Sequence, residues 1–159
     1  MIQKEKEIKS KSRLDINRTL LGVIFTVFAL IISLNPSLLR ESFLVPLQLT
    51  LAIPLLLAST FARSKLAYTK KPKMWEKYGF FTFLLGYSFL INIIGIILSA
   101  SISLYIGLAF LIFNILTSVT YSIFEIVEDK TKIKSRIKKD LLFSIILLFG
   151  GILPSIRFY

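Results

Sequence analysis

Neutral polar side chains are the strongest candidates for chemistry in this sequence, because they fall inside long apolar runs. In chain order they are Gln48, Asn92, Asn114, Ser118 and Tyr121. Amides and hydroxyls can coordinate cations or small polar solutes without bearing charge. They can also hydrogen-bond between neighbouring helices, where each contributes about 0.5–2 kcal/mol. We favour the packing role, since apolar helices need small and polar residues where they touch.

Several chemistries are excluded within this chain. It contains no Cys and no His, which removes thiolate catalysis, Cys/His zinc sites and imidazole acid–base steps. No charged residue lies well inside an apolar run, which speaks against proton relays and aspartyl proteolysis. We therefore expect no cofactor, no metal site and no enzyme. An enzyme would have to use residues at a membrane surface, such as Glu125, Tyr121 and Asp140.

The elements that position these side chains are predicted by composition and by uncharged runs. Of 159 residues, 55% are hydrophobic, more than one soluble core of this size could bury. The run between residues 78 and 124 is too long for one helix and fits two, with a break near 99–103. The sequence thus predicts an all-α polytopic bundle, in which residues 19–159 form one domain with five transmembrane helices, at about 19–39, 42–62, 78–98, 103–124 and 141–156.

Two local features qualify this pattern. The last run, 141–156, would be only about 24 Å long as a helix. We expect it to cross the membrane with flanking Lys and Arg side chains reaching the surfaces, and a re-entrant or interfacial segment is the alternative. Asp140 is placed to cap that helix. Pro54 lies in the middle of the second span and is a candidate kink.

Charge predicts the orientation. Six Lys or Arg fall in each of the segments 1–18, 63–78 and 126–140, and two lie elsewhere. Such an excess marks the cytoplasmic side. We expect a cytoplasmic N-terminal segment at 1–18, basic cytoplasmic loops at 63–77 and 125–140, and the C-terminus outside. The expected location is the cell membrane, as a multi-pass protein of a prokaryotic cytoplasmic membrane.

We interpret the net charge of +11 as serving contact with anionic lipid headgroups on the cytoplasmic side, and not binding of nucleic acid. In the last basic loop, Ile133 and Ile137 alternate with basic residues, which suits a helix lying on the inner leaflet. A solvated, charged extension of the preceding helix fits equally well. The expected lipid contacts are Lys132, Lys134, Arg136, Lys138 and Lys139.

Together these patterns favour a non-enzymatic component of a membrane assembly, either a homo-oligomer or a complex with a further membrane partner. The alternative is a small channel or permease for ions or polar solutes, lined by the neutral amides. An interfacial membrane enzyme is third.

Overall fold

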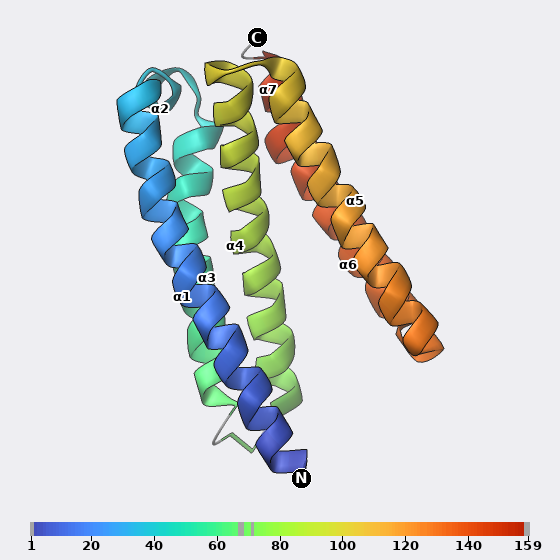
Figure 1. Ribbon diagram of the computed structural model, residues 1–159. Helices are drawn as coiled ribbons and strands as arrows, with labels where there is room; N and C mark the ends of the chain where they lie inside the picture. The colour runs from blue at the N-terminus through green and yellow to red at the C-terminus, as the bar shows by residue number, and fades with distance from the viewer. Residues whose placement is uncertain (1, 67–68, 71, 158–159) are drawn as a thin grey trace.

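A computed structural model shows the chain as helices joined by short turns (Figure 1). It describes residues 2–66, 69–70 and 72–157, with side chains from residue 15 onward. In that part no strand occurs, and five helices are long and apolar enough to cross a membrane, so the predicted all-α fold is confirmed. The elements are α1 (Ile2–Leu34), α2 (Leu38–Glu41), α3 (Leu44–Lys65), α4 (Pro72–Ser101), α5 (Leu104–Glu128), the 3₁₀ turn η1 (Lys130–Lys132), α6 (Ile133–Leu147), the π-helical turn η2 (Leu148–Ile152) and α7 (Leu153–Arg157).

Local sequence explains where these helices begin and end. Pro36 lies just after α1, and Pro72 is the first residue of α4, a position where its missing N–H costs nothing. The long uncharged run breaks between α4 and α5, where Ser103 is extended at φ −166° and ψ 140°. By contrast, α3 continues through Pro54 from Leu44 to Lys65. Most basic side chains of the 1–18 segment lie outside the described side chains, which begin at residue 15.

The last helix that could cross a membrane is longer than the uncharged run suggested. α6 begins at Ile133, and η2 and α7 continue it to Arg157 without a gap. Together with η1, this candidate span covers 28 residues, from Lys130 to Arg157, or about 42 Å as a helix. The helix extends through the charged residues because lysine and arginine stems can lie along its end while their charged groups stay in water.

This extension overturns the expected capping role of Asp140, which lies inside α6. Asp129 acts instead at the turn between α5 and α6. The backbone N–H of Thr131 donates to Asp129 Oδ1 at 3.0 Å, and the Thr131 hydroxyl donates to the same oxygen at 2.6 Å. These bonds stabilise the carboxylate and hold the pKa of Asp129 below its usual value.

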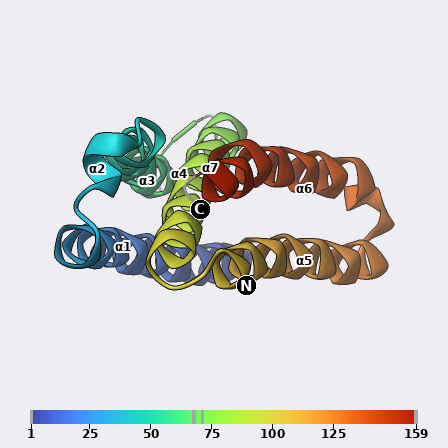
Figure 2. The ribbon, with the colours of Figure 1, turned by 90° about the horizontal axis from the view of Figure 1, so that it is seen from above.

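α4 is the central helix of the bundle. Figure 2 shows α4 between the α1–α3 pair and the α5–α6 hairpin. In the most apolar part of α4, 61% of the residues are buried, against 17% in the corresponding part of α5. One apolar core joins α4 to α1 and α3 around Ile31, Leu56 and Ile93. A second joins α4 to α5 and α6 around Leu111 and Leu147. The α5–α6 hairpin therefore packs on the rest of the bundle mainly through α4.

Small residues bring α4 and α5 together at one end only. A Cβ on Gly107 would overlap Ser99 Oγ, and one on Gly95 would lie 2.6 Å from Leu111 Cγ. Toward the other end, the glycines of α4, Gly79 and Gly86, face α3. The rings of Phe83 and Tyr87 lie on the side of the hairpin, where Tyr87 stacks on Phe143, and the α5–α6 hairpin diverges from the rest of the bundle (Figure 1).

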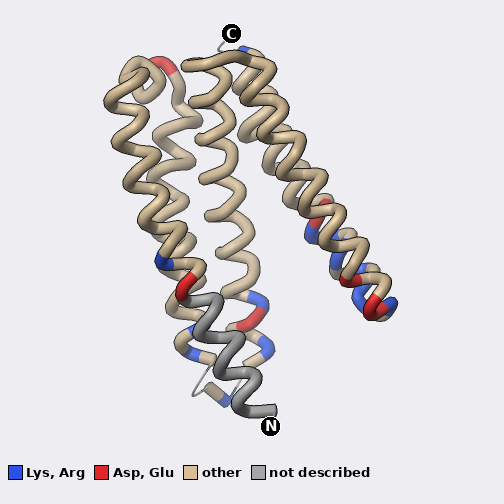
Figure 3. The backbone as a smooth tube through the Cα atoms, viewed as in Figure 1, with Lys and Arg blue, Asp and Glu red and all other residues tan. Residues whose placement is uncertain are grey.

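The end at which the hairpin diverges is also the charged one. Figure 3 shows Lys, Arg, Asp and Glu gathered there on α1, α3, α4 and around η1, whereas few charged residues lie at the end with α2 and α7. We call these the basic end and the opposite end.

Candidate functional site

Two of the predicted amides meet in the interior of the bundle. Asn92 on α4 donates its Nδ2–H to Gln48 Oε1 on α3 at 2.7 Å. Gln48 Nε2 in turn donates to the carbonyl of Gly150 at 2.9 Å, and Asn92 Nδ2 also reaches the carbonyl of Ile146 at 3.2 Å. Both amide side chains are buried, Asn92 completely. The pair thus links α3 and α4 to α6 and η2.

The π-helical turn η2 makes this contact possible. A Cβ on Gly150 would overlap Asn92 Nδ2, and a Cβ on Gly151 would lie 2.6 Å from Asn92 Oδ1. The two glycines therefore let the backbone of η2 approach the buried amides closely. A π-turn also shifts the helical hydrogen-bond register, and here the Gly150 carbonyl accepts a side-chain hydrogen bond.

Asn114 is not part of this hydrogen-bonded group. Its Nδ2 donates to the Phe110 carbonyl of its own helix at 2.9 Å. Asn114, Ser118 and Tyr121 line a separate cleft between α4 and the α5–α6 hairpin. The five candidate residues therefore form two groups. Gln48 and Asn92 form a buried contact, and the other three line one wall of the cleft.

We call this space the basic cleft; it has a volume of about 990 Å³. It lies where the hairpin diverges and is lined by residues of α1, α3, α4, α5, η1 and α6. Its volume is at the upper end of the range of about 300–1,000 Å³ usual for small-molecule sites. Its lining includes six Lys or Arg and two Glu, so the cleft carries net positive charge.

An aromatic surface forms the apolar part of the lining. The Phe83 and Tyr87 rings stack at a centroid distance of 5.8 Å, and Tyr87 stacks on Phe143 of α6 at 6.1 Å. This row joins α4 to α6. Phe80 extends the apolar wall on α4 and is 43% exposed. The cleft is therefore amphipathic, with rings on one part and charges on another.

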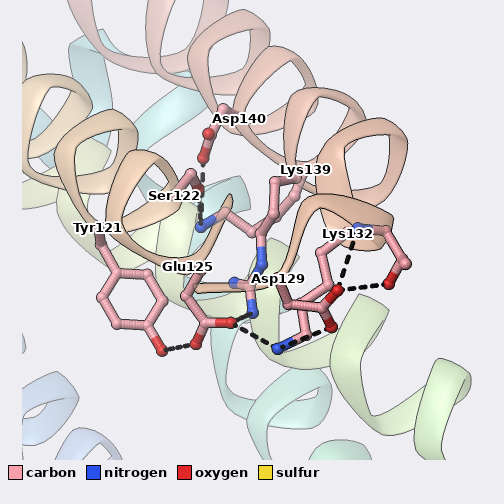
Figure 4. Close-up of polar contacts among 9 residues, drawn as sticks. Tyr121, Ser122, Glu125, Asp129, Lys132, Lys139 and Asp140 are labelled. Atoms are coloured by element: carbon pink, nitrogen blue, oxygen red, sulfur yellow. Dashed lines mark hydrogen bonds and ion pairs between the residues drawn. The ribbon is translucent and has the colours of Figure 1, made fainter. Parts of the chain in front are cut away.

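The basic end of the hairpin is held by a compact ion cluster (Figure 4). Glu125 Oε2 accepts from Arg136 Nη2 at 2.8 Å and from Lys132 Nζ at 3.3 Å. The Tyr121 hydroxyl donates to the other oxygen of Glu125 at 2.6 Å. Arg136 and Lys139 also lie over the Tyr121 ring, 5.5 and 5.6 Å from its centroid.

A second polar contact lies one turn deeper in the hairpin. The Ser118 hydroxyl donates to Asp140 Oδ1 at 2.9 Å, and Lys139 Nζ lies 3.2 Å from the same oxygen. Lys139 also donates to Ser122 Oγ at 3.3 Å. These contacts connect α5 and α6 and partly neutralise the cations of the hairpin (Figure 4).

The five expected lipid-contact residues do not share one face. Lys132, Arg136 and Lys139 line the basic cleft, whereas Lys134 and Lys138 are exposed outside it. The segment that carries them consists of a short turn and the first turns of α6, which continues the fifth crossing.

The sequence analysis missed the opposite wall of the cleft and one inter-helix contact. Lys73 and Lys77 line the cleft from α4, but their charges had been counted only toward topology. Asn17 of α1 is fully buried and donates to Thr60 Oγ1 at 3.1 Å and to Ser59 Oγ at 3.3 Å. The flanking charges placed Asn17 outside the first span, and only its burial marks it as part of a helix contact.

In chemical terms, the basic cleft offers cations, hydroxyls and aromatic rings. Among the described residues, no group of three or more Asp or Glu side chains could hold a metal ion. The arrangement suits binding of an amphipathic, negatively charged molecule.

The chain matches no protein-family model, no curated protein and no solved structure at a significant level.

Proposed function

We propose that this chain is a non-enzymatic integral membrane protein of the cell membrane, with its N-terminus in the cytoplasm, and that it acts as a component of a membrane assembly. The basic cleft is the place where another membrane constituent binds. In this orientation, the basic end lies at the cytoplasmic leaflet, in agreement with the distribution of Lys and Arg.

One observation carries the proposal: polar side chains of α5 face a cleft that no helix fills within the described part of the chain. Asn114 and Ser118 are half-buried on that wall and Thr117 is exposed. Asn114 lies near the middle of α5, where lipid tails offer polar groups no hydrogen bonds. Polar residues at such depth face protein, a ligand or water. A constituent bound in the cleft would cover them.

The hydrogen bonds in the interior favour this role over that of a channel. A pore through the bundle would need amides available to a solute. Gln48 and Asn92 hydrogen-bond instead to each other and to the backbone of the last crossing. The contact of Gly95 and Gly107 further brings α4 and α5 together at the opposite end.

The test introduces a bulky side chain on the α5 wall, so that this side chain occupies the cleft. The protein is purified in a mild detergent, and the mass of each complex is measured by native mass spectrometry. We expect wild type to retain an additional mass, and Thr117→Trp to lose it because the indole occupies the cleft. Thr120→Trp is the matched control, since Thr120 is exposed on the same helix and does not line the cleft. Wild type with no additional mass and no second copy would contradict the proposal.

A further inference from the structure

We infer that the basic cleft binds an anionic phospholipid of the leaflet at the basic end, with the headgroup between two basic walls and an acyl chain along the aromatic row. This inference rests on the proposed function and specifies its ligand. It is narrower than general attraction of a basic protein to an anionic membrane, because it assigns the binding to one cleft and to named side chains.

The two walls of the cleft carry cations that face a shared space. The wall formed by α3 and α4 contributes Arg63, Lys73 and Lys77, and the hairpin contributes Lys132, Arg136 and Lys139. Like charges on opposite walls repel each other, and an anion between them removes that repulsion. A phosphodiester headgroup, with its negative charge and acceptor oxygens, matches this arrangement.

The charge that remains for a ligand lies mainly on α4. In the hairpin, Glu125 pairs with Arg136 and Lys132, and Asp140 pairs with Lys139. On α4, Lys73 and Lys77 are exposed, and neither pairs with a carboxylate among the residues that the structure describes. We therefore assign the headgroup contact chiefly to these two lysines.

Below the charged rim, the cleft offers an apolar surface of suitable shape for a lipid chain. Phe80 is exposed toward the cleft, and the stacked row of Phe83, Tyr87 and Phe143 continues from it. Arg63 is itself buried, with its guanidinium 5.7 Å from the centre of the Phe83 ring, so that charge and ring meet at one place. A headgroup at the rim and a chain on the rings would use both features at once.

Charge also favours a lipid over a transmembrane helix of another protein. Membrane proteins concentrate Lys and Arg at the cytoplasmic ends of their spans. Such a helix would bring its positive end against the positive rim of the cleft. The anionic lipids of the cytoplasmic leaflet have the opposite sign and are abundant in that leaflet.

The experiment compares phospholipids that differ only in the headgroup. The full chain is stripped of lipid in detergent and titrated with phosphatidylglycerol or phosphatidylcholine of identical acyl chains, and bound lipid is counted by native mass spectrometry. Inorganic phosphate is titrated separately, to show whether a phosphate group alone suffices. We expect one phosphatidylglycerol per chain, bound about tenfold more tightly than phosphatidylcholine and released by salt.

Two charge variants locate the site. Lys73→Gln with Lys77→Gln should weaken phosphatidylglycerol binding about tenfold, because each lysine near the headgroup contributes several-fold. Lys70→Gln with Lys130→Gln is the matched control, since both lysines are exposed and do not line the cleft. This control should bind like wild type. Because all four residues are exposed, the helical circular dichroism and thermal unfolding of both variants should match wild type.

The possible failures are distinguishable. Equal binding of the two phospholipids, or equal loss in the two charge variants, would overturn the inference while leaving the proposed function in place. A polypeptide retained by wild type and lost in Thr117→Trp would do the same. Binding of inorganic phosphate as tight as phosphatidylglycerol would also overturn it, because the acyl chain would then contribute nothing. If no constituent is retained and no lipid binds, both the inference and the proposed function fail.

Discussion

The side-chain amide of Asn92 donates to Oε1 of Gln48 at 2.7 Å in the buried interior of the bundle. This bond connects α3 to α4, and each partner also reaches a backbone carbonyl of the last crossing. The two neighbouring amides therefore link α3, α4 and the last helix to one another.

We expect the two amides to be energetically coupled. Replacing either Gln48 or Asn92 with Leu should reduce the free energy of unfolding by about 0.5–2 kcal/mol. The double variant should lose less than the sum, because both single variants break the same bond. Asn114→Leu combined with Asn92→Leu should be additive, since the Asn114 amide bonds within its own helix. Unfolding in mixed micelles measures all of these, and additivity of the Gln48 and Asn92 variants would refute the coupling.

The glycines of η2 should not tolerate a methyl group. Gly151→Ala would place a Cβ 2.6 Å from Asn92 Oδ1 and 3.0 Å from Leu111 Cδ2, a steric conflict that typically costs about 1–3 kcal/mol. Gly22→Ala is the control, because no atom lies within 4 Å of the position that the added Cβ would take. Thermal unfolding should show a lower midpoint for Gly151→Ala and an unchanged or higher midpoint for Gly22→Ala. Equal effects would mean that η2 does not pack against Asn92 as described.

The orientation can be tested by cysteine labelling, since the chain has no cysteine of its own. Single cysteines at Ser64 and Ser135 should be protected from an impermeant maleimide in intact cells, because they lie in or beside basic segments. A cysteine at Ser101, at the end of α4, should be labelled. Permeabilised cells provide the control for reactivity. Labelling at Ser64 from outside would reverse the proposed orientation.

Removing a negative charge from the rim should strengthen binding of anionic lipid. Glu76 is exposed, lines the basic cleft and lies between Lys73 and Lys77 on α4. Glu76→Gln should increase the affinity for phosphatidylglycerol several-fold at low salt, and less at high salt because the interaction is screened. Glu128→Gln serves as the control, since Glu128 is exposed and lies outside the cleft. An unchanged affinity would show that the rim does not contact the headgroup.

Solute flux separates the proposed role from that of a channel. Proteoliposomes containing the purified wild-type chain should pass ions and small polar solutes no faster than empty liposomes. The reason is that Gln48 and Asn92 bond to each other and to η2. Flux that is present in wild type and lost in Asn114→Leu, while the variant still folds, would instead support a conducting site.

The five helices that are long and apolar enough to cross a membrane were predictable, because each contains an apolar run bounded by charge and hydropathy alone measures that property. The start of the last helix was not predictable. A hydropathy pattern places the end of the apolar span at Lys139 and Asp140, whereas the helical backbone extends past them to Ile133. A helix can carry charged residues at its end when their long stems reach water. The partner of an amide is also not encoded locally. Asn92 could have paired with Asn114, but it bonds to Gln48, next to the close approach of Gly150 and Gly151.

The basic cleft was not predictable at all from the sequence pattern. It arises because α4 and α5 touch at Gly95 and Gly107 and diverge from there, which depends on three-dimensional contacts between two helices. Asn114 and Ser118 were recognised as polar, but nothing in their spacing showed which space they face. The lysines on the opposite wall looked like ordinary topology signals.

The divergence of the hairpin would also determine how much area the protein occupies at each depth of a bilayer that it spans. Since α4 and α5 meet at one end and separate toward the other (Figure 1), the bundle is wedge-shaped and broader at the basic end, which in the proposed orientation would lie in the cytoplasmic leaflet. A wedge displaces unequal numbers of lipids from the two monolayers and alters the lateral pressure that each exerts. We expect the chain to partition differently between flat and strongly curved bilayers of equal composition, and fluorescence from labelled chain in vesicles of graded diameter would measure that preference.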